Sequence, residues 1–217
     1  MYGETAPSTK AGVQKCTLEK FELSIVTTNK YKGPALDIVF KLENGLDLSV
    51  RKFPIDKAKI ASDLDMYPER FKKKDGTIRT ADDIAGSKMK DLSSYIKHIV
   101  TGFVTEDVWM QKINEWVQAN NFVPGVHEPS FDQFVIMAKS MLPASYNTVE
   151  GTIAVGFKVD SQYMEIPDEM YVMGDFFCTV LNPKKIADPD TKYMRSTRWT
   201  RNNPDAPVPV VKGESDF

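Results

Sequence analysis

The residue types that enzymes use for chemistry are sparse in this chain of 217 residues. Its histidines are His98 and His127. His127-Glu128 with Asp132 resembles part of a metal site, but no further ligands follow at zinc-like spacing, so a loop before a helix is the expected role. The acidic pairs all lie in loop-like stretches, where solvated carboxylates are the default: Asp63/Asp65, Asp82/Asp83 and Asp188/Asp190. With no phosphate-binding glycine loop, G-x-S-x-G or C-x-x-C motif, we expect no enzyme, no metal and no cofactor.

Binding of a single-stranded nucleic acid needs no titratable catalytic group. It needs cations near the phosphates and exposed rings on which bases stack. Three stretches interleave these two residue types, and they supply the candidate nucleic-acid-binding residues: Lys30, Tyr31, Lys32; Arg51, Lys52, Phe53; Lys192, Tyr193, Arg195, Arg198, Trp199, Arg201. Trp199 is the most specific of these, because it lies among hydrophilic residues where a core position is hard to arrange.

Each stretch also has a structural interpretation. A lysine-flanked Tyr31 is typical of a solvated loop, and Phe53 before Pro54 is as well suited to closing a core as to stacking a base. Trp199 has the option of packing back on the sheet. The run Lys72-Lys73-Lys74 is expected to face solvent without fixed structure, and it adds positive charge.

Charge is unevenly distributed along the chain, although the net charge is only −2. Residues 183–201 hold six cations against two anions, and residues 204–217 hold one cation against three anions. A basic segment is therefore followed by an acidic tip that ends in Gly213-Glu214-Ser215-Asp216-Phe217. A terminal ring beside carboxylates, on a proline-bearing leash, is suited to an apolar pocket with a basic rim. We treat Glu214, Asp216 and Phe217 as candidate partner-binding residues, against the alternative of an inert tail end.

Hydrophobic periodicity predicts three antiparallel strands between residues 17 and 54, with Asn44-Gly45 as a type I′ turn. Residues 55–86 are interpreted as a long, partly mobile connection. Helical spacing predicts three helices over residues 87–143, the second and third beginning at Thr105 and Ser130. Strand patterns return at 148–160, 162–167 and 175–181.

These elements define the expected fold class, α+β. Gly151 and Gly156 suggest bulges or curvature in a returning strand, which favours an OB-like antiparallel β-barrel of five to six strands with an all-helical insertion after the third strand. The expected organisation is a flexible arm over 1–12, a single domain over 13–201 with its insertion at about 56–147, and a flexible acidic-tipped tail over 202–217. Cys16 and Cys178 are expected to be reduced, because no secretion signal or membrane span is visible.

The segment GPALDIVFKLENG, followed by a strand and Phe53-Pro54, resembles the front half of single-stranded DNA-binding proteins from tailed bacteriophages. The resemblance is densest over residues 12–55 and weaker over 148–181. It implies an OB-type barrel broken by a helical insertion and a sequence-tolerant coating of single-stranded DNA. The acidic tip is similar to that of bacterial and phage members, with fewer aspartates, which implies recruitment of replication or recombination proteins.

The sequence therefore predicts nonspecific single-stranded DNA binding in phage DNA replication and recombination, in the host cytoplasm, by a protein that is neither secreted nor in a membrane. Self-association is left open. The alternative is a phage structural or assembly protein that uses the helical block as an interaction module. In that case Trp109 and Trp116, which are seven residues apart on one helix face, are expected to be exposed.

Overall fold

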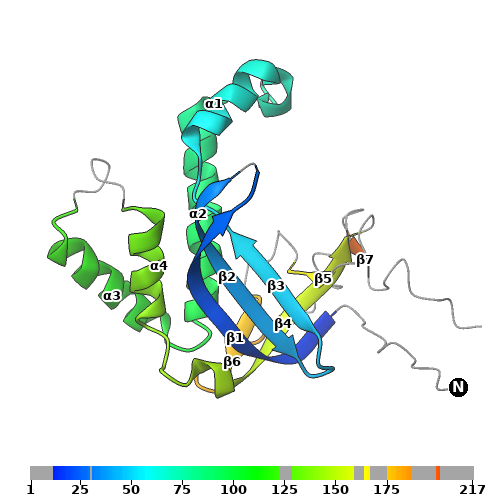
Figure 1. Cartoon of the computed structure of the whole chain (residues 1–217), viewed down its shortest axis with the longest axis vertical. Coiled ribbons are helices and arrows are strands. Elements are labelled where there is room, and N and C mark those ends of the chain that lie inside the picture. The colour runs from blue at the N-terminus through cyan, green and yellow to red at the C-terminus, as the bar shows by residue number, and fades with distance from the viewer. Residues whose placement is uncertain are drawn as a thin grey trace, which may run out of the picture.

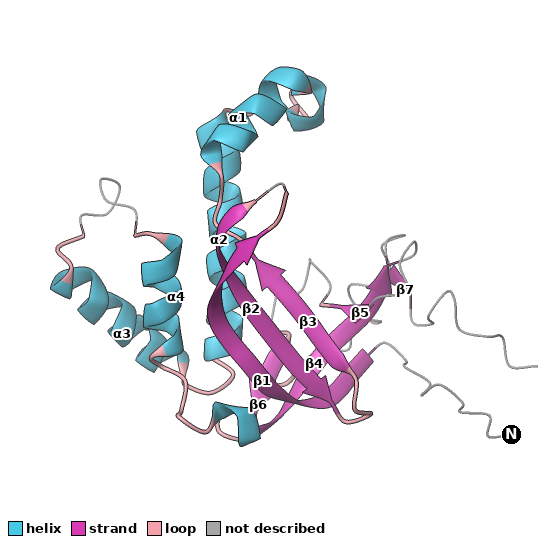
Figure 2. Ribbon diagram, viewed as in Figure 1, coloured by secondary structure: helices cyan, strands magenta, loops and turns pink. Residues whose placement is uncertain are grey.

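The computed structural model describes residues 12–29, 31–122, 129–158, 164–166, 175–186 and 199–200. Its strands are β1 (Gly12–Thr27), β2 (Lys32–Leu42), β3 (Asp47–Lys52), β4 (Glu150–Lys158), β5 (Met164–Glu165), β6 (Phe177–Thr179) and β7 (Trp199–Thr200). Its helices are α1 (Lys57–Met66), α2 (Ala81–Val100), α3 (Glu106–Ala119) and α4 (Phe131–Lys139), with short 3₁₀ turns η1 (Pro68–Phe71) and η2 (Tyr146–Thr148). Figures 1 and 2 show the antiparallel sheet with the helices beside it, so the α+β class is confirmed. No helix in these ranges is long and apolar enough to cross a bilayer.

The central sheet has the order β3-β2-β1-β4-β5, and all of these pairs are antiparallel. β6 and β7 also pair with β4. The strands at the two ends of the order, β3 and β5, have Cα atoms within 8 Å of one another, but no ladder joins them among the described residues. The sheet is therefore open, and the closed barrel expected from the sequence is not confirmed.

β1 bends between two partners. Its first part, Gly12 to Thr17, pairs with β4, and its remainder pairs with β2. The register with β2 shifts between Leu18 and Lys20, and such a bulge increases strand twist and bending. The curvature therefore arises here, while Gly151 lies in unbroken pairing. Gly151 is needed for a different reason, because a Cβ there would lie 2.7 Å from the Cys178 carbonyl oxygen.

The turn between β2 and β3 differs from the prediction. A type I′ turn requires a positive φ at both central residues. Gly45 alone has one, at 82°, and the hydrogen bonds run from Gly45 N to Leu42 O and from Leu42 N to Leu46 O. This pattern is a three-residue loop in which the glycine takes the left-handed position, so the hairpin is confirmed and its turn type is wrong.

The main core lies between the sheet and α2. Inward-facing residues of β1 and β2, including Phe21, Ile38 and Phe40, form one continuous cluster with the buried face of α2, where Ile96 and Ile99 have no exposed surface. The apolar residues that alternate along the strands and those at helical spacing in α2 thus pack together in one layer. Both cysteines are buried and free in this core, as expected, and burial raises the pKa of Cys16 to about 12.

Residues 55–86 consist largely of defined elements, so the interpretation of this stretch as a long connection is wrong. They form α1, η1 and the first turns of α2, with a small apolar cluster of Ile60, Ile84 and Ala85 that is separate from the main core. α2 starts six residues earlier than the pattern predicted, because Thr80 and Asp83 form a reciprocal capping box. Gly86 lies in this first part, where its low helix propensity conceals the helix in the sequence.

The predicted starts of α3 and α4 are confirmed, since Thr105 and Ser130 accept hydrogen bonds from the first turns of these helices. Trp109 is buried, and its ring packs edge-on against Phe134 of α4. Trp116 contacts Phe134 and Phe122. Trp109 is therefore packed inside the helical block and Trp116 is half-buried, so the exposed tryptophan face that would have favoured an interaction module is not seen.

Candidate nucleic-acid interface

An aromatic pair marks one end of the sheet. Tyr31 lies in the β1–β2 loop and Phe53 directly follows β3, and their ring centroids are 5.0 Å apart in an edge-to-face arrangement. The Tyr31 hydroxyl donates a hydrogen bond to the Pro34 carbonyl at 2.5 Å, which fixes the ring, while Phe53 is 41% exposed. Two residues far apart in sequence thus present one apolar surface to solvent. We call this pair the aromatic platform.

The surroundings of the platform carry both signs of charge. Lys32 is exposed beside Tyr31. Burial, followed by the carboxylates of Asp132 and Asp56, raises the pKa of the Tyr31 phenol, so anionic groups lie within electrostatic range of the ring. Carboxylates as well as the exposed ammonium of Lys32 therefore lie around Tyr31.

Arg51 lies on the same outer face of the sheet as Phe53. Its Nε donates to Asp37 Oδ1 at 2.5 Å, and Lys20 Nζ reaches Asp37 Oδ2 at 3.4 Å. The hydrogen bond from Arg51 holds the pKa of Asp37 below its ordinary value, so the carboxylate stays charged. Arg51 and Lys20 thus neutralise Asp37, while Glu22, which lies opposite Asp37, pairs with Lys139 of α4.

Lys52 is directed away from the platform. Side chains alternate along a strand, so a residue between Arg51 and Phe53 faces the opposite side. Lys52 lies opposite Leu36, and its Nζ sits 4.0 Å from the centroid of the Tyr95 ring of α2. We therefore leave Lys52 out of the site. Because Lys52 directly follows Arg51 in a predicted strand, the sequence alone could have placed the two side chains on opposite faces of the sheet.

Most of the other candidate residues lie outside the described residues. This holds for Lys30, for Lys192, Tyr193, Arg195, Arg198 and Arg201, and for Glu214, Asp216 and Phe217. Trp199 opens β7, whose backbone pairs with Lys158 of β4. The structure thus brings Tyr31 and Phe53 together, with Lys32 next to Tyr31 and Arg51 two residues before Phe53 in the chain, and the remaining assignments stay predictions.

Sequence reasoning missed a charged cluster at the end of α2. His98 Nδ1 lies 3.0 Å from Asp175 Oδ1, and Lys184 Nζ donates to the same oxygen at 2.9 Å. The hydrogen bond with His98, and then Lys184, lower the pKa of Asp175 to about 2. Lys184 also reaches the Thr101 hydroxyl at 3.0 Å. The cluster ties the segment around β6 to α2, and no sequence signal links partners that are 77 residues apart.

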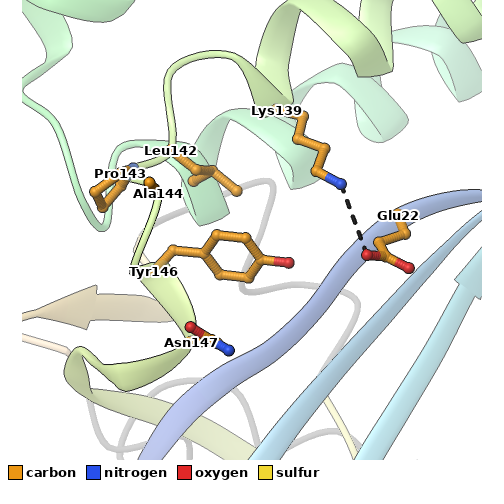
Figure 3. Close-up of a pocket in the computed structure, with 7 residues that line it drawn as sticks. All are labelled: Glu22, Lys139, Leu142, Pro143, Ala144, Tyr146 and Asn147. Atoms are coloured by element: carbon orange, nitrogen blue, oxygen red, sulfur yellow. Dashed lines mark ion pairs between the residues drawn. The ribbon is translucent and has the colours of Figure 1, made fainter.

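A pocket of about 430 Å³ lies where the chain passes from α4 to β4 (Figure 3). Lys139 lines it and pairs with Glu22 at 3.8 Å, and the Tyr146 hydroxyl accepts the Phe21 N–H at 3.3 Å. These contacts cover the part of β1 that lies beyond its pairing with β4. Glu22, Lys139 and the Tyr146 hydroxyl, which face the pocket, are thus engaged in holding this part of β1.

No group of three or more histidine, cysteine or acidic residues suited to hold a metal occurs within the part of the chain that the structure describes. The fold defines an α+β protein with an open antiparallel sheet. Comparisons with protein-family models, with curated proteins and with solved structures find no match for this chain.

Proposed function

We propose that this protein binds single-stranded DNA without sequence preference, by stacking bases on the aromatic platform and by contacting phosphates with Lys32 and Arg51. The observation that carries the proposal is the edge-to-face pair of Tyr31 and Phe53, in which the Phe53 ring is 41% exposed. Stacking accepts every base, because every base has a π-face, and each stacked base contributes about 1–3 kcal/mol.

The position of the platform supports this function. The finer part of the proposal is an OB-type architecture, in which β3 and β5 are the edges that approach each other. OB folds bind oligonucleotides on the face of their second and third strands and on the loop between the first two. Tyr31 occupies that loop, and Arg51 and Phe53 occupy the third strand and its end.

Three further parts of the proposal depend on the resemblance to phage proteins. We propose a role in DNA replication or recombination within the host cytoplasm. We also propose that the tip with Glu214, Asp216 and Phe217 recruits protein partners, and that the 192–201 stretch adds cations and rings to the same strand. The chemistry is consistent, because none of these steps requires a catalytic group or a cofactor.

Titration of labelled oligothymidine by fluorescence anisotropy tests the function. We expect nanomolar-to-micromolar binding at low salt that weakens steeply as salt is added. Phe53→Ala should lower affinity roughly 5- to 150-fold, which corresponds to one lost stacking contact of about 1–3 kcal/mol.

Ile25→Ala is the matched control for this substitution. Ile25 is an apolar residue of β1, 73% exposed, so its truncation removes apolar surface without removing a ring. The affinity of the Ile25→Ala variant for oligothymidine should stay within about twofold of the parent value. An absence of binding by the parent protein at low salt would refute the function, and equal losses in both variants would refute the platform.

A further inference from the structure

Residues 67–79 form an ordered hairpin that neither the sheet nor the aromatic platform accounts for; we call it the basic hairpin. Lys72 and Ile78 form an antiparallel bridge, and Lys73 N donates to Thr77 O at 2.7 Å. The turn contains Gly76 at a φ of 87°, and the Asp75 carboxylate accepts from both the backbone N–H and the hydroxyl of Thr77. These bonds fix the backbone of a segment whose three successive lysines suggested a structureless loop.

The hairpin is mounted on a rigid arm. α1 and the start of α2 pack on each other through the small cluster of Ile60, Ile84 and Ala85, which holds the hairpin away from the main core. Figures 1 and 2 show this arm extending beyond the sheet at the end from which the β1–β2 hairpin projects. The chain enters α1 at Lys57, four residues after Phe53 of the platform. The arm therefore continues outward from the proposed binding site.

The hairpin has an excess of positive charge. Residues 67–79 contain five cations and two anions: Arg70, Lys72, Lys73, Lys74, Arg79, Glu69 and Asp75. Lys72 pairs with Glu69 at 3.3 Å, and Asp75 is held by Thr77. Lys73 and Lys74 are exposed and have no carboxylate within ion-pair distance among the described residues, and Lys73 lies within electrostatic range of Asp75 and Asp83. Charge is thus presented to solvent on a fixed backbone.

A ring lies beside these cations. Tyr67 is 44% exposed, and the Arg70 guanidinium sits 4.3 Å from the centroid of its ring. A cation held on an aromatic face is positioned for phosphate, while the free side of the ring remains available for a base. The same two components, cation and ring, form the platform at Tyr31 and Phe53.

We propose that the basic hairpin is a second contact for the sugar–phosphate backbone of the strand held at the platform, an inference that rests on the proposed function. The ten residues of α1 separate the two contacts by about 15 Å of helix. At about 3.4 Å per stacked nucleotide, this separation corresponds to roughly four or five nucleotides. A short oligonucleotide would thus occupy the platform alone, and a longer one would reach both contacts.

The test compares two double variants of the full chain on two oligothymidines, of about 4 and about 20 nucleotides, in a salt series. Lys73→Gln with Lys74→Gln removes the two unpaired charges of the hairpin. Lys88→Gln with Lys90→Gln, on the exposed side of α2 in the same arm, removes the same charge elsewhere. On the long strand, the hairpin variant should reduce the slope of log K against log salt by about 1.4, since each lost phosphate contact removes about 0.7. At 0.1 M salt this corresponds to about 25-fold weaker binding.

Each outcome decides one point. On the short strand, both variants should match the parent protein, and on the long strand the α2 variant should do so. If the two variants lose the same slope, the effect is overall charge, and the inference is overturned. If the hairpin variant binds the long strand as tightly as the parent protein does, the hairpin does not contact DNA, and the inference is also overturned. If the parent protein binds neither strand, the proposed function itself fails.

Discussion

Gly102 offers a sharp test of the packing that holds the sheet against the helices. It lies just past the end of α2 and is buried. A Cβ built there would lie 2.5 Å from Cδ1 of Phe177 and 3.0 Å from the Ile99 carbonyl oxygen. The Phe177 ring has no exposed surface and is held between Phe40 and Phe103, at centroid distances of 5.1 and 5.6 Å. The ring therefore has no free space into which it can move.

Two effects of Gly102→Ala oppose each other, and their sizes decide the sign. The lower backbone entropy of the unfolded chain favours alanine by about 0.4–1 kcal/mol. Overpacking of a filled core costs about 1–3 kcal/mol. We expect Gly102→Ala to lower the free energy of unfolding by about 1.3 kcal/mol, within the range of about 0–2.6 kcal/mol that the two effects span. Gly86→Ala should raise it by about 0.5–1 kcal/mol, because this exposed helical glycine has no atom within 4 Å of its added Cβ.

Urea denaturation followed by far-UV circular dichroism measures both changes, with equal m-values as the condition for comparison. In a Phe177→Leu background, the cost of Gly102→Ala should fall by at least about 1 kcal/mol, because the two sites are in contact. If the two glycine variants shift stability in the same direction, or if the two core substitutions are additive, the packing argument is refuted.

Two further predictions concern charged groups that lie against α2, Asp175 beside His98 and Lys52 over Tyr95. Asp175→Asn should lower the free energy of unfolding by about 1 kcal/mol at pH 7. The lowered pKa of Asp175, about 2, implies roughly 2.4 kcal/mol, and we reduce this value because the side chain is 34% exposed. Since the folded-state pKa is depressed from 3.8, this stabilisation is present above pH 3.8 and is lost as the pH falls toward 2. The urea midpoints of parent and variant should therefore differ at pH 7 and converge near pH 2. A difference that stays constant with pH would contradict this prediction. Lys52→Gln should leave oligothymidine affinity within about twofold of the parent value in the anisotropy assay, because the ammonium lies over Tyr95 on the core side; a tenfold loss would return Lys52 to the site.

Local signals predicted the regular elements well where one face meets the core. Phe21 and Leu48 alternate with polar neighbours and are buried, and the caps at Thr105 and Ser130 begin the helices that they predicted. The arm was missed because α1 buries only Ile60 fully, so its sequence carries almost no apolar period. A short polar helix becomes stable by packing on a neighbour, and that neighbour, the start of α2, was concealed by Gly86.

The site was harder to predict than the fold. Its geometry depends on which face of the sheet each strand residue occupies and on contacts between segments that are distant in the sequence. Composition groups Arg51, Lys52 and Phe53 into one basic-aromatic stretch, yet the pleat separates Lys52 from the other two. The partner of Phe53 is instead Tyr31, 22 residues earlier, which the β1–β2–β3 register brings to the same end of the sheet. A stretch of cations and rings within a strand is therefore evidence for an interface only when the residues that alternation places on the same face are considered together. In the hairpin of residues 67–79, by contrast, a direct contact joins the two residue types, since the Arg70 guanidinium lies over the exposed Tyr67 ring.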